Sequence, residues 1–343
     1  MSRRTLTLLL ASLLALGLTG AAVATPVPYV ALVPGPTYNT LAAIDGEQVI
    51  AITGREVFPT DGHLDLTTVG VQNQLTLFEA LQGWFSRDEA VVPRDVVYPP
   101  DKTTDQVNAE NAESMVRSQN SAVTAAAREL GFETVEVSVA EIGEGSPSQG
   151  RLKVGDVLRT VGGEPVLDEA GLIAAVRSAG VGAAVKIGYV RAGVDGVATI
   201  TTAAATDDAT RAIIGIQPAE KALDLPFKVD ITLEQVGGPS AGLMFALGIL
   251  DKLDRASLTG GEFIAGTGEI SANGAVGPIG GITQKLIASR RKGAVVFLVP
   301  AANCAEALRR PPAGLILAEV ATLDDALAAL EAVRAGRQPE LCG

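Results

Sequence analysis

Hydrophobic residues are concentrated most densely near the start of the chain. The run Leu6–Ala24 contains no charged residue and follows two arginines, Arg3 and Arg4. Its length matches the roughly 20 residues that an α-helix needs to cross a bilayer. Because positive residues stay on the cytoplasmic side, the arginines place the N-terminus in the cytoplasm and the remainder outside it. The pattern therefore predicts a single-pass cell-membrane protein with an extracytoplasmic main body.

A cleaved signal peptide is the alternative interpretation of the same run. The small residues Ala22–Ala24 fit a signal-peptide cleavage site, and cleavage at Ala24 would make the protein secreted. We favour an uncleaved anchor over residues 1–27, because the chain stays apolar from Pro26 to Pro34 and leads straight into a predicted strand.

Residues 28–131 mix turns with short strands and helices. β-Branched residues indicate the strands, and helical spacing of apolar residues indicates the helices. No part of this region carries obvious chemistry, and we interpret it as a collar that packs against the later domains. The predicted strands are Gln48–Thr53 and Leu64–Val71, and the predicted helices are Leu75–Phe85 and Thr104–Gly131.

Residues 132–205 change to short strands in which apolar and polar residues alternate, as in Val135–Val139. The string Gly-x-Leu-x-x-Gly-Asp-Val-Leu at Gly150–Leu158, followed by a Gly-Gly-Glu-Pro-Val turn, resembles that of bacterial PDZ domains. Such domains bind an extended peptide as an added strand at an open sheet edge. The resemblance implies a groove between the strand at 135–140 and the helix at 172–176. A small β-domain without a ligand is the alternative.

Strands and helices alternate in residues 206–343, which predicts an α/β layer architecture. The mostly apolar run Leu243–Leu253 has the pattern of a helix buried in a core. Asn273-Gly274 is a strong signal for a hairpin turn, and the apolar run 293–300 predicts a buried strand. The expected fold class is therefore α/β (α+β), preceded by the small β-domain and the N-terminal membrane helix.

Composition and charge exclude several classes of function. The formal net charge of −12 argues against nucleic acid, whose binding requires a basic surface. One histidine and two cysteines give no zinc cluster, so we expect no metal. No Gly-x-x-x-x-Gly-Lys-Ser/Thr phosphate loop occurs, so we expect no ATP and no other cofactor. In an exported domain Cys304 and Cys342 can pair and tie down the C-terminal tail, and two free thiols are the equal alternative.

The segment Gly237–Gly242 carries the candidate nucleophile. Proline is favoured at the first position of a helix, so Gly238 is the predicted cap, Pro239 the first helical residue, and Ser240 lies just inside the helix. Flanking glycines let a substrate backbone approach the Ser240 hydroxyl. Backbone N–H groups at Gly238, Ser240 and Ala241 can hold an oxyanion. Alternatively, Ser240 only satisfies a local backbone donor.

The base for this serine cannot come from a conventional triad. The same residues fit the Gly-x-Ser-x-Gly elbow of α/β-hydrolases, which requires a histidine after the serine. The only histidine, His63, precedes Ser240 and is expected in an exposed loop. A lysine can serve instead when desolvation lowers its pKa and leaves a neutral amine. Lys285 shares a short predicted helix face with Ile282 and Leu286, which is compatible with burial, but on spacing alone a stem that snorkels to the surface is the favoured interpretation.

Four linked motifs between residues 211 and 330 resemble the proteolytic domain of Lon-type proteases. Their order and spacing match that family, and the combination is far more specific than any one motif alone. The motifs are Gly238–Gly242, Thr267–Ile270, Pro278–Ile282 and Lys285.

The resemblance implies roles for individual residues. Ser240 is the nucleophile and Lys285 the general base of a Ser-Lys dyad, with Thr267 as a hydrogen-bond partner that orients the lysine. The chain departs from many Lon proteases at Gly237, where an acidic residue often stands, and this removes any carboxylate support for the dyad at that position. Glu269 matches the family motif with either a structural or a catalytic role.

We therefore expect a membrane-anchored, ATP-independent serine endopeptidase that cleaves extended segments of exported or membrane polypeptides. Its PDZ module would recruit or gate peptides, and it would form a homo-oligomer if it follows the rings common among Lon-like domains. The alternative from another class is a non-catalytic adaptor, in which the PDZ module captures peptides and the Lon-like domain serves packing or assembly. A cytosolic hydrolase with an apolar N-terminus is a weaker third reading.

Overall fold

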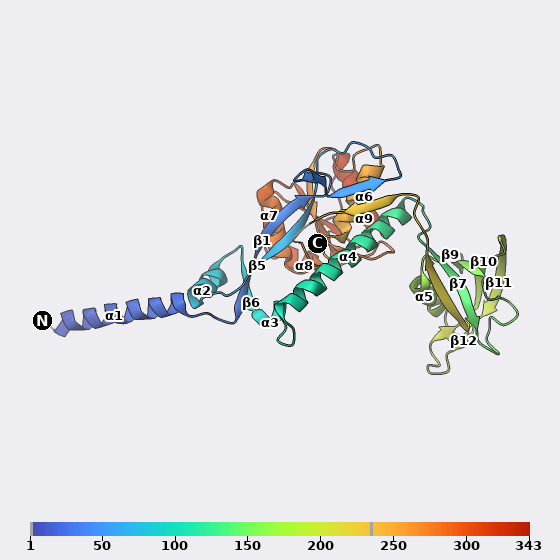
Figure 1. The fold of residues 1–343 in the computed structure, drawn as a ribbon, viewed down its shortest axis with the longest axis horizontal. Helices are drawn as coiled ribbons and strands as arrows, with labels where there is room; N and C mark the ends of the chain where they lie inside the picture. The colour runs from blue at the N-terminus through green and yellow to red at the C-terminus, as the bar shows by residue number, and fades with distance from the viewer. Residues whose placement is uncertain (1–2, 234–235) are drawn as a thin grey trace. The chain divides into compact units, whose positions relative to one another are not determined.

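The structure is a computed structural model that describes residues 3–233 and 236–343 (Figure 1). The chain divides into two compact units. The first unit combines residues 1–126 with 227–343, and the second contains residues 127–226. The second unit is thus inserted in sequence between the two halves of the first.

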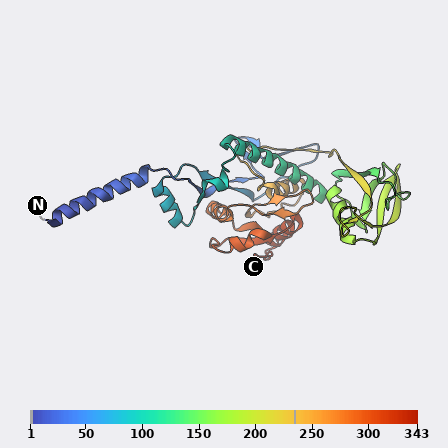
Figure 2. The same ribbon diagram turned by 90° about the horizontal axis from the view of Figure 1, so that it is seen from below.

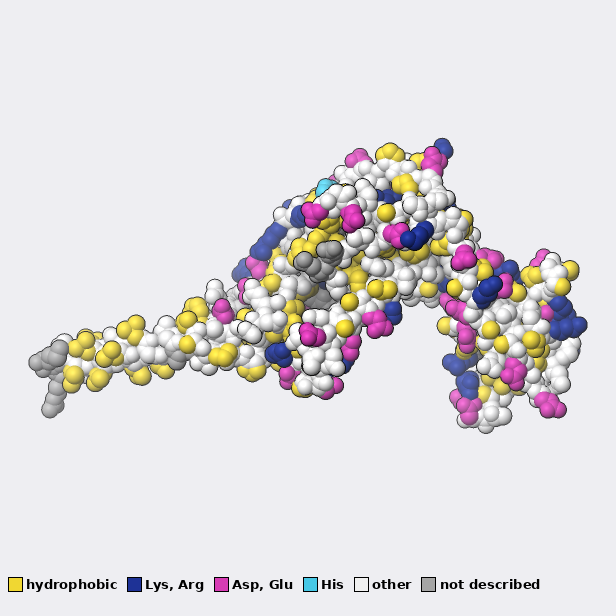
Figure 3. Space-filling model, in the orientation of Figure 1, with side chains coloured by type: hydrophobic (Ala, Val, Ile, Leu, Met, Phe, Trp, Pro, Cys, Tyr) yellow, Lys and Arg dark blue, Asp and Glu magenta, His cyan; other side chains and the backbone are white. Residues whose placement is uncertain are grey.

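Helix α1, Arg3–Ala24, is the first element of the described chain (Figure 2). Its residues Arg4–Ala24 are long and apolar enough to cross a membrane, and its leucine side chains are exposed (Figure 3). A signal sequence near an N-terminus has the same properties. The helix is therefore compatible with both interpretations of the sequence.

A mixed sheet in the order β20-β19-β16-β5-β1-β6 forms the centre of the first unit. β5 is parallel to β16 on one side and antiparallel to β1 on the other. The region 28–131, expected as a separate collar, therefore supplies strands to the same sheet as the region 206–343. The strands are β1 Tyr29–Asn39, β5 His63–Gln72, β6 Ala90–Pro93, β16 Phe263–Gly266, β19 Val296–Pro300 and β20 Ile316–Val320.

Helices pack against this sheet and bring the site residues to it. Helix α6, Gly242–Leu253, is buried along its whole length, as its all-round apolar pattern predicts. Helix α7, Ile282–Lys292, contacts both β1 and β5. The other elements of this unit are α2 Leu77–Phe85, α3 Arg94–Val97, α4 Thr104–Glu129, η1 Ala301–Asn303, α8 Cys304–Ala307 and α9 Leu323–Arg334, with the strand pairs β2 Ala43–Ile44 and β3 Glu47–Gln48, β4 Ile50–Thr53 and β15 Lys228–Ile231, and β17 Glu269–Ile270 and β18 Val276–Gly277.

The second unit is a small sheet in the order β11-β10-β8-β7-β14 with one helix, α5. Its core contains buried side chains from the strands and the helix, among them Leu158, Leu172 and Ile187. The elements are β7 Val135–Ile142, β8 Val157–Val161, β9 Glu164–Pro165, α5 Glu169–Ala179, β10 Ala184–Arg191, β11 Val194–Thr201, β12 Ala203–Ala204, β13 Ala212–Ile213 and β14 Ile216–Ala222.

The edge strand beside helix α5 is β14, which lies after the expected domain end at residue 205. β14 pairs antiparallel with β7 along residues 135–142, and β8 pairs with the other side of β7. The prediction that a peptide adds to the strand at 135–140 is therefore wrong, because that strand already has a partner on each side. A hollow of about 220 Å³ lies instead between α5 and residues 211–218, and its α5 lining includes Leu172 and Val176.

Cys304 and Cys342 form a disulfide in the first unit, with their Cα atoms 5.2 Å apart. The sequence left this pairing and two free thiols as equal alternatives. The bond joins α8 to the C-terminal tail, and both cysteines belong to the buried core cluster around Phe297.

Candidate active site

Ser240 lies in the loop that leads into α6, and not inside the helix as expected. The helix begins at Gly242, and Ala241 is its N-cap residue. The carbonyl oxygen of Ser240 accepts hydrogen bonds from the Gly268 N–H at 2.9 Å and from Thr267 Oγ1 at 3.0 Å. These bonds tie the Ser240 carbonyl to residues 267 and 268 instead of to the next turn of a helix. The preference of proline for a helix start is a local signal and does not predict them.

Helix α4 holds the same loop from the other side. Ser118 Oγ donates to the carbonyl oxygen of Pro239 at 2.8 Å. The carbonyl oxygen of Asn111 accepts the N–H of Gly238 at 2.9 Å. Asn111 and Ser118 are seven residues apart and so share one face of the helix. Sequence reasoning missed both residues, and no side-chain pattern indicates the Asn111 contact, because its backbone carbonyl oxygen makes it.

Two glycines allow α4 to approach this closely. A Cβ atom added at Gly237 would stand 3.0 Å from the Cβ of Asn111. One added at Gly242 would stand 2.7 Å from Ser118 Oγ. An acidic residue in place of Gly237 would therefore require Asn111 to shift, which gives a steric reason for the departure noted in the sequence.

Of the three backbone N–H groups expected to hold an oxyanion, one is already hydrogen-bonded in the described parts of the chain and two are not. Gly238, which we expected to contribute to an oxyanion hole, already gives its N–H to Asn111, so it is not free for that role. Within residues 3–233 and 236–343, the N–H groups of Ser240 and Ala241 have no hydrogen-bond acceptor in the protein. These two donors are therefore available to an oxyanion at the start of α6.

Lys285 lies on the buried face of α7, as predicted, and only 2% of its surface is exposed. Its Nζ atom lies 2.8 Å from Ser240 Oγ and 2.8 Å from Thr267 Oγ1. Burial lowers the pKa of Lys285 from 10.5 to about 7. A neutral amine at hydrogen-bond distance from a hydroxyl can accept the hydroxyl proton.

Thr267 connects the two residues. Its side chain is fully buried, accepts a hydrogen bond from Lys285 Nζ and donates one to the carbonyl oxygen of Ser240 at 3.0 Å. With both bonds made, its hydroxyl cannot rotate freely. The site therefore places Ser240, Lys285 and Thr267 together, as the sequence predicts.

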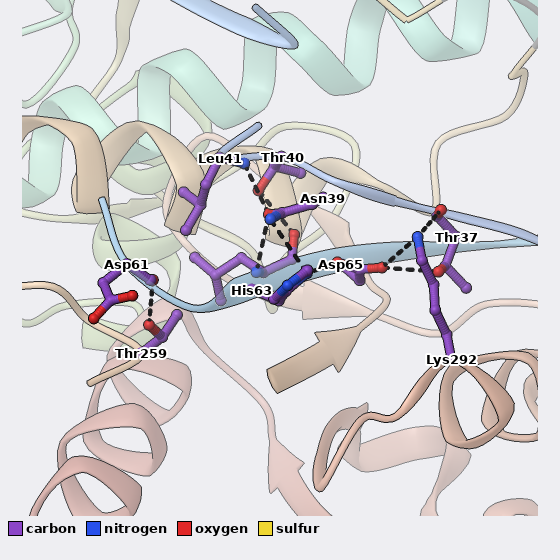
Figure 4. Close-up of polar contacts among 10 residues, drawn as sticks. Thr37, Asn39, Thr40, Leu41, Asp61, His63, Asp65, Thr259 and Lys292 are labelled. Carbon is purple, nitrogen blue, oxygen red and sulfur yellow. Dashed lines mark hydrogen bonds and ion pairs between the residues drawn. The ribbon is translucent and has the colours of Figure 1, made fainter. Parts of the chain in front are cut away.

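A polar network ties the far end of α7 to the sheet (Figure 4). Lys292 Nζ lies 3.1 Å from Asp65 Oδ2 and 2.7 Å from the carbonyl oxygen of Thr37. Thr37 Oγ1 donates to the same carboxylate at 2.8 Å, and Asp65 is fully buried on β5. Because Lys292 follows Lys285 by two turns of the helix, this network restrains the helix that carries Lys285.

His63 belongs to the same network and not to the Ser240 site. It is the first residue of β5 and half-exposed, where we expected a loop. Its Nδ1 lies 3.4 Å from Asp65 Oδ1 and 3.3 Å from Asn39 Nδ2 (Figure 4), and its ring stacks on Phe263. Its described partners thus include neither member of the Ser240–Lys285 pair.

Ser240 and Lys285 open into a cavity of about 420 Å³. Residues 67–70 of β5 form one wall, and Glu269, an exposed residue of β17, forms part of another. β16 pairs with β5 only as far as Leu66. In the described parts of the chain, the edge of β5 beyond Leu66 on that side therefore has no partner strand.

Comparison with known sequences identifies both domains. Residues 231–329 match the model of the Lon protease (S16) C-terminal proteolytic domain, and residues 107–202 match that of the PDZ domain. The chain carries a Lon-type proteolytic domain and a PDZ domain. Both matches confirm the fold class that the sequence predicts. The PDZ match ends before β14, the edge strand of that unit.

The relatives of the Lon-type domain are much longer than this chain. It is 32% identical over 114 residues to Lon protease 2 of Bacillus subtilis, covering 33% of this chain and 20% of that protein. It is 39% identical over 94 residues to Lon protease 1 of Sorangium cellulosum, covering 26% of this chain and 11% of that protein. The chain therefore spans one fifth or less of the length of these two relatives.

Two solved structures that resemble part of the chain are PDZ domains. That of an SdrC-like protein from Listeria monocytogenes is 24% identical, with a TM-score of 0.23, and covers 25% of this chain and 88% of its own. The PDZ domain of an SdrC-like protein from Listeria innocua is 27% identical, also with a TM-score of 0.23, and the match covers 24% of this chain and 92% of that one.

Proposed function

We propose that this chain is a membrane-anchored serine endopeptidase whose Lon-type domain works without ATP. Ser240 is the nucleophile and Lys285 its general base. The observation that carries the proposal is the 2.8 Å separation of Ser240 Oγ from the buried Lys285 Nζ, whose pKa burial lowers to about 7.

The reaction follows from these positions. Neutral Lys285 accepts the hydroxyl proton as Ser240 Oγ attacks the scissile carbonyl carbon. The N–H groups of Ser240 and Ala241 stabilise the oxyanion. The Lys285 ammonium then gives its proton to the leaving amine, and the acyl-enzyme remains on Ser240. Lys285, neutral again, takes a proton from the water that attacks the ester and gives it to Ser240 Oγ as the ester bond breaks, which restores the hydroxyl and the neutral amine. Thr267 keeps the amine in line throughout.

The substrate is an extended segment of a polypeptide. Among the described residues, the cavity wall at residues 67–70 of β5 pairs with β1 on one side and has no partner strand on the side of β16, where a substrate can bind through backbone hydrogen bonds. A segment that is already paired within a folded sheet or helix cannot bind in this way, whereas an extended loop, terminus or unfolded stretch can. Exported or membrane polypeptides with loose or extended parts are therefore the substrate class that suits the site.

The PDZ domain recruits or gates peptides at the edge of β14. The hollow beside this strand has apolar lining from Leu172 and Val176, with Arg177 and Arg211 also on its walls. A peptide strand paired with β14 would place one apolar side chain in the hollow.

Helix α1 and the disulfide support an exported main body. Arg3 and Arg4 precede the apolar helix, which favours a cytoplasmic N-terminus and an exported main body. The disulfide between Cys304 and Cys342 suits an oxidising compartment outside the cytoplasm. Cleavage after α1 would make the same domains a secreted protein.

Labelling with a fluorophosphonate, which reacts with activated serines, tests the proposal. The full chain should be labelled at Ser240 and should cleave unfolded polypeptides without ATP. The variants Ser240→Ala and Lys285→Arg should do neither, because the first lacks the hydroxyl and the guanidinium of the second does not deprotonate. Lys228→Arg, at an exposed lysine paired with Asp230, is the matched control. An unlabelled Ser240 in a folded chain that still binds peptides would favour the adaptor. Full activity in Lys285→Arg would remove Lys285 as the base.

A further inference from the structure

Helix α2 has an apolar face that the described parts of the chain leave largely exposed, although the Trp84 ring packs edge-on against Tyr29. Its exposed large residues recur at the spacing of one helix face, and Phe85 is 88% exposed. Burying such a face would remove a large apolar and aromatic surface from water. The residues of this face, which we call the α2 apolar face, are Leu77, Phe78, Leu81, Trp84 and Phe85.

The opposite side of α2 is fixed to the first unit. Ala80 is buried in a cluster with Ala31 and Leu75. A Cβ atom added at Gly83 would stand 2.6 Å from a methyl carbon of Val91. The helix therefore cannot turn its apolar face inward, since small residues pack its other side tightly against the strands.

The start of α2 is hydrogen-bonded to the chain that leaves α1. The N–H of Leu77 donates to the carbonyl oxygen of Thr25, the first residue after α1, at 2.9 Å. The N–H of Val27 donates to the carbonyl oxygen of Leu75 at 2.8 Å. Figures 1 and 2 both show α2 beside the C-terminal end of α1. The α2 apolar face thus begins at the level where the apolar span ends.

We propose that the α2 apolar face inserts into the interfacial zone of the bilayer that α1 anchors. The inference rests on the proposed anchor. Amphipathic helices of this kind bury their apolar face by about 5–10 Å at the boundary of headgroups and acyl chains. Tryptophan and other aromatic residues are enriched at that depth, because they present an apolar ring with a polar edge.

Charged residues beside the face suit the headgroup layer. Arg87 and Arg310 line a hollow of about 590 Å³ together with Trp84 and Phe85. Asp88 in the same hollow is paired with Arg291 of α7. The two arginines therefore lie beside the aromatic side chains, where lipid phosphates would meet them. Insertion at this depth would fix the catalytic unit at the membrane surface, where chains that emerge from the bilayer are accessible.

The single tryptophan of the chain, Trp84, makes the proposal measurable in the unmodified protein. The full chain is reconstituted into vesicles of phosphatidylcholine and phosphatidylglycerol that carry a spin label at a shallow or a deep acyl carbon. We expect Trp84 fluorescence to be quenched more by the shallow label than by the deep one, and to be protected from aqueous iodide. The control Trp84→Phe with Gln82→Trp moves the reporter to the polar face of the same helix and should reverse the pattern.

The possible outcomes distinguish a failure of the insertion proposal from a failure of the proposed α1 anchor. Vesicles that carry the protein while Trp84 stays open to iodide and unquenched by lipid would overturn the insertion and leave the anchor intact. Protection from iodide without quenching by either lipid would mean that a second copy of the chain covers the face, which also overturns it. Equal quenching at positions 82 and 84 would refute the choice of face. A protein that does not float with vesicles would end both proposals.

Discussion

The dependence of cleavage on pH follows directly from the environment of Lys285. The perturbation is pH itself, because only the neutral amine can accept the Ser240 proton. With a pKa of about 7, the neutral fraction rises from about one tenth at pH 6 to about nine tenths at pH 8. We therefore expect kcat/KM to rise about tenfold between these values and to be flat above them.

The assay uses a fluorogenic peptide with no group that titrates between pH 5 and 10, and circular dichroism verifies the fold at each pH. The pKa shift comes from burial and from no ion pair, so added salt should leave the midpoint in place. A rate already maximal at pH 6 would mean that Lys285 is not the base. A rate still rising at pH 9 would mean that its pKa stays close to 10.5, and the reasoning from burial would be refuted.

Lys285→Met should raise the free energy of unfolding at pH 7 by a few kcal/mol in chemical denaturation, because bringing a lysine of ordinary pKa 10.5 to a site of pKa about 7 costs about 5 kcal/mol. This cost declines as pH rises from 7 to 10.5, because the lysine then loses its proton in the unfolded chain as well. The extra stability of Lys285→Met should therefore shrink over that range. Thr267→Val should lower kcat by up to about 100-fold with little change in KM. Asp65→Asn should reduce the free energy of unfolding by about 1–3 kcal/mol and lower kcat without moving the pH midpoint. Cys304→Ser with Cys342→Ser should reduce stability by about 2–4 kcal/mol in thermal unfolding.

Each of these has a clear contrary result. A less stable Lys285→Met would mean that the amine is not strained by burial. An unchanged kcat in Thr267→Val would remove its orienting role. A shifted pH midpoint in Asp65→Asn would place that carboxylate in the titration of the base. If the double serine variant were as stable as the unmodified chain, the disulfide would make no contribution to the free energy of unfolding.

Local signals in the sequence predicted many single elements. The helix expected at Leu75–Phe85 is α2, and that expected at Thr104–Gly131 is α4, each within two residues at either end. Short-range spacing placed Lys285 on the apolar face of its helix, and the resemblance to Lon-type domains was needed to favour its burial. These features depend on residues within a few turns of one another, which the pattern of apolar positions records.

Contacts between distant residues could not be read from the sequence. Leu66 pairs with Gly266 across 200 positions, so nothing local indicated that the first strands complete the catalytic sheet. Nor did a local pattern show that Asn111 and Ser118 of α4 hold the Ser240 loop. The same limit explains β14, which closes the PDZ unit from beyond its apparent end.

The most direct test of the account is the titration of the Lys285 amine by NMR. The chain is prepared with lysine labelled with ¹³C at the ε carbon, and the Lys285→Arg spectrum assigns the signal. We expect a midpoint near pH 7 for Lys285. A midpoint close to 10.5 would contradict it, because the amine beside Ser240 would then be charged wherever the protein works.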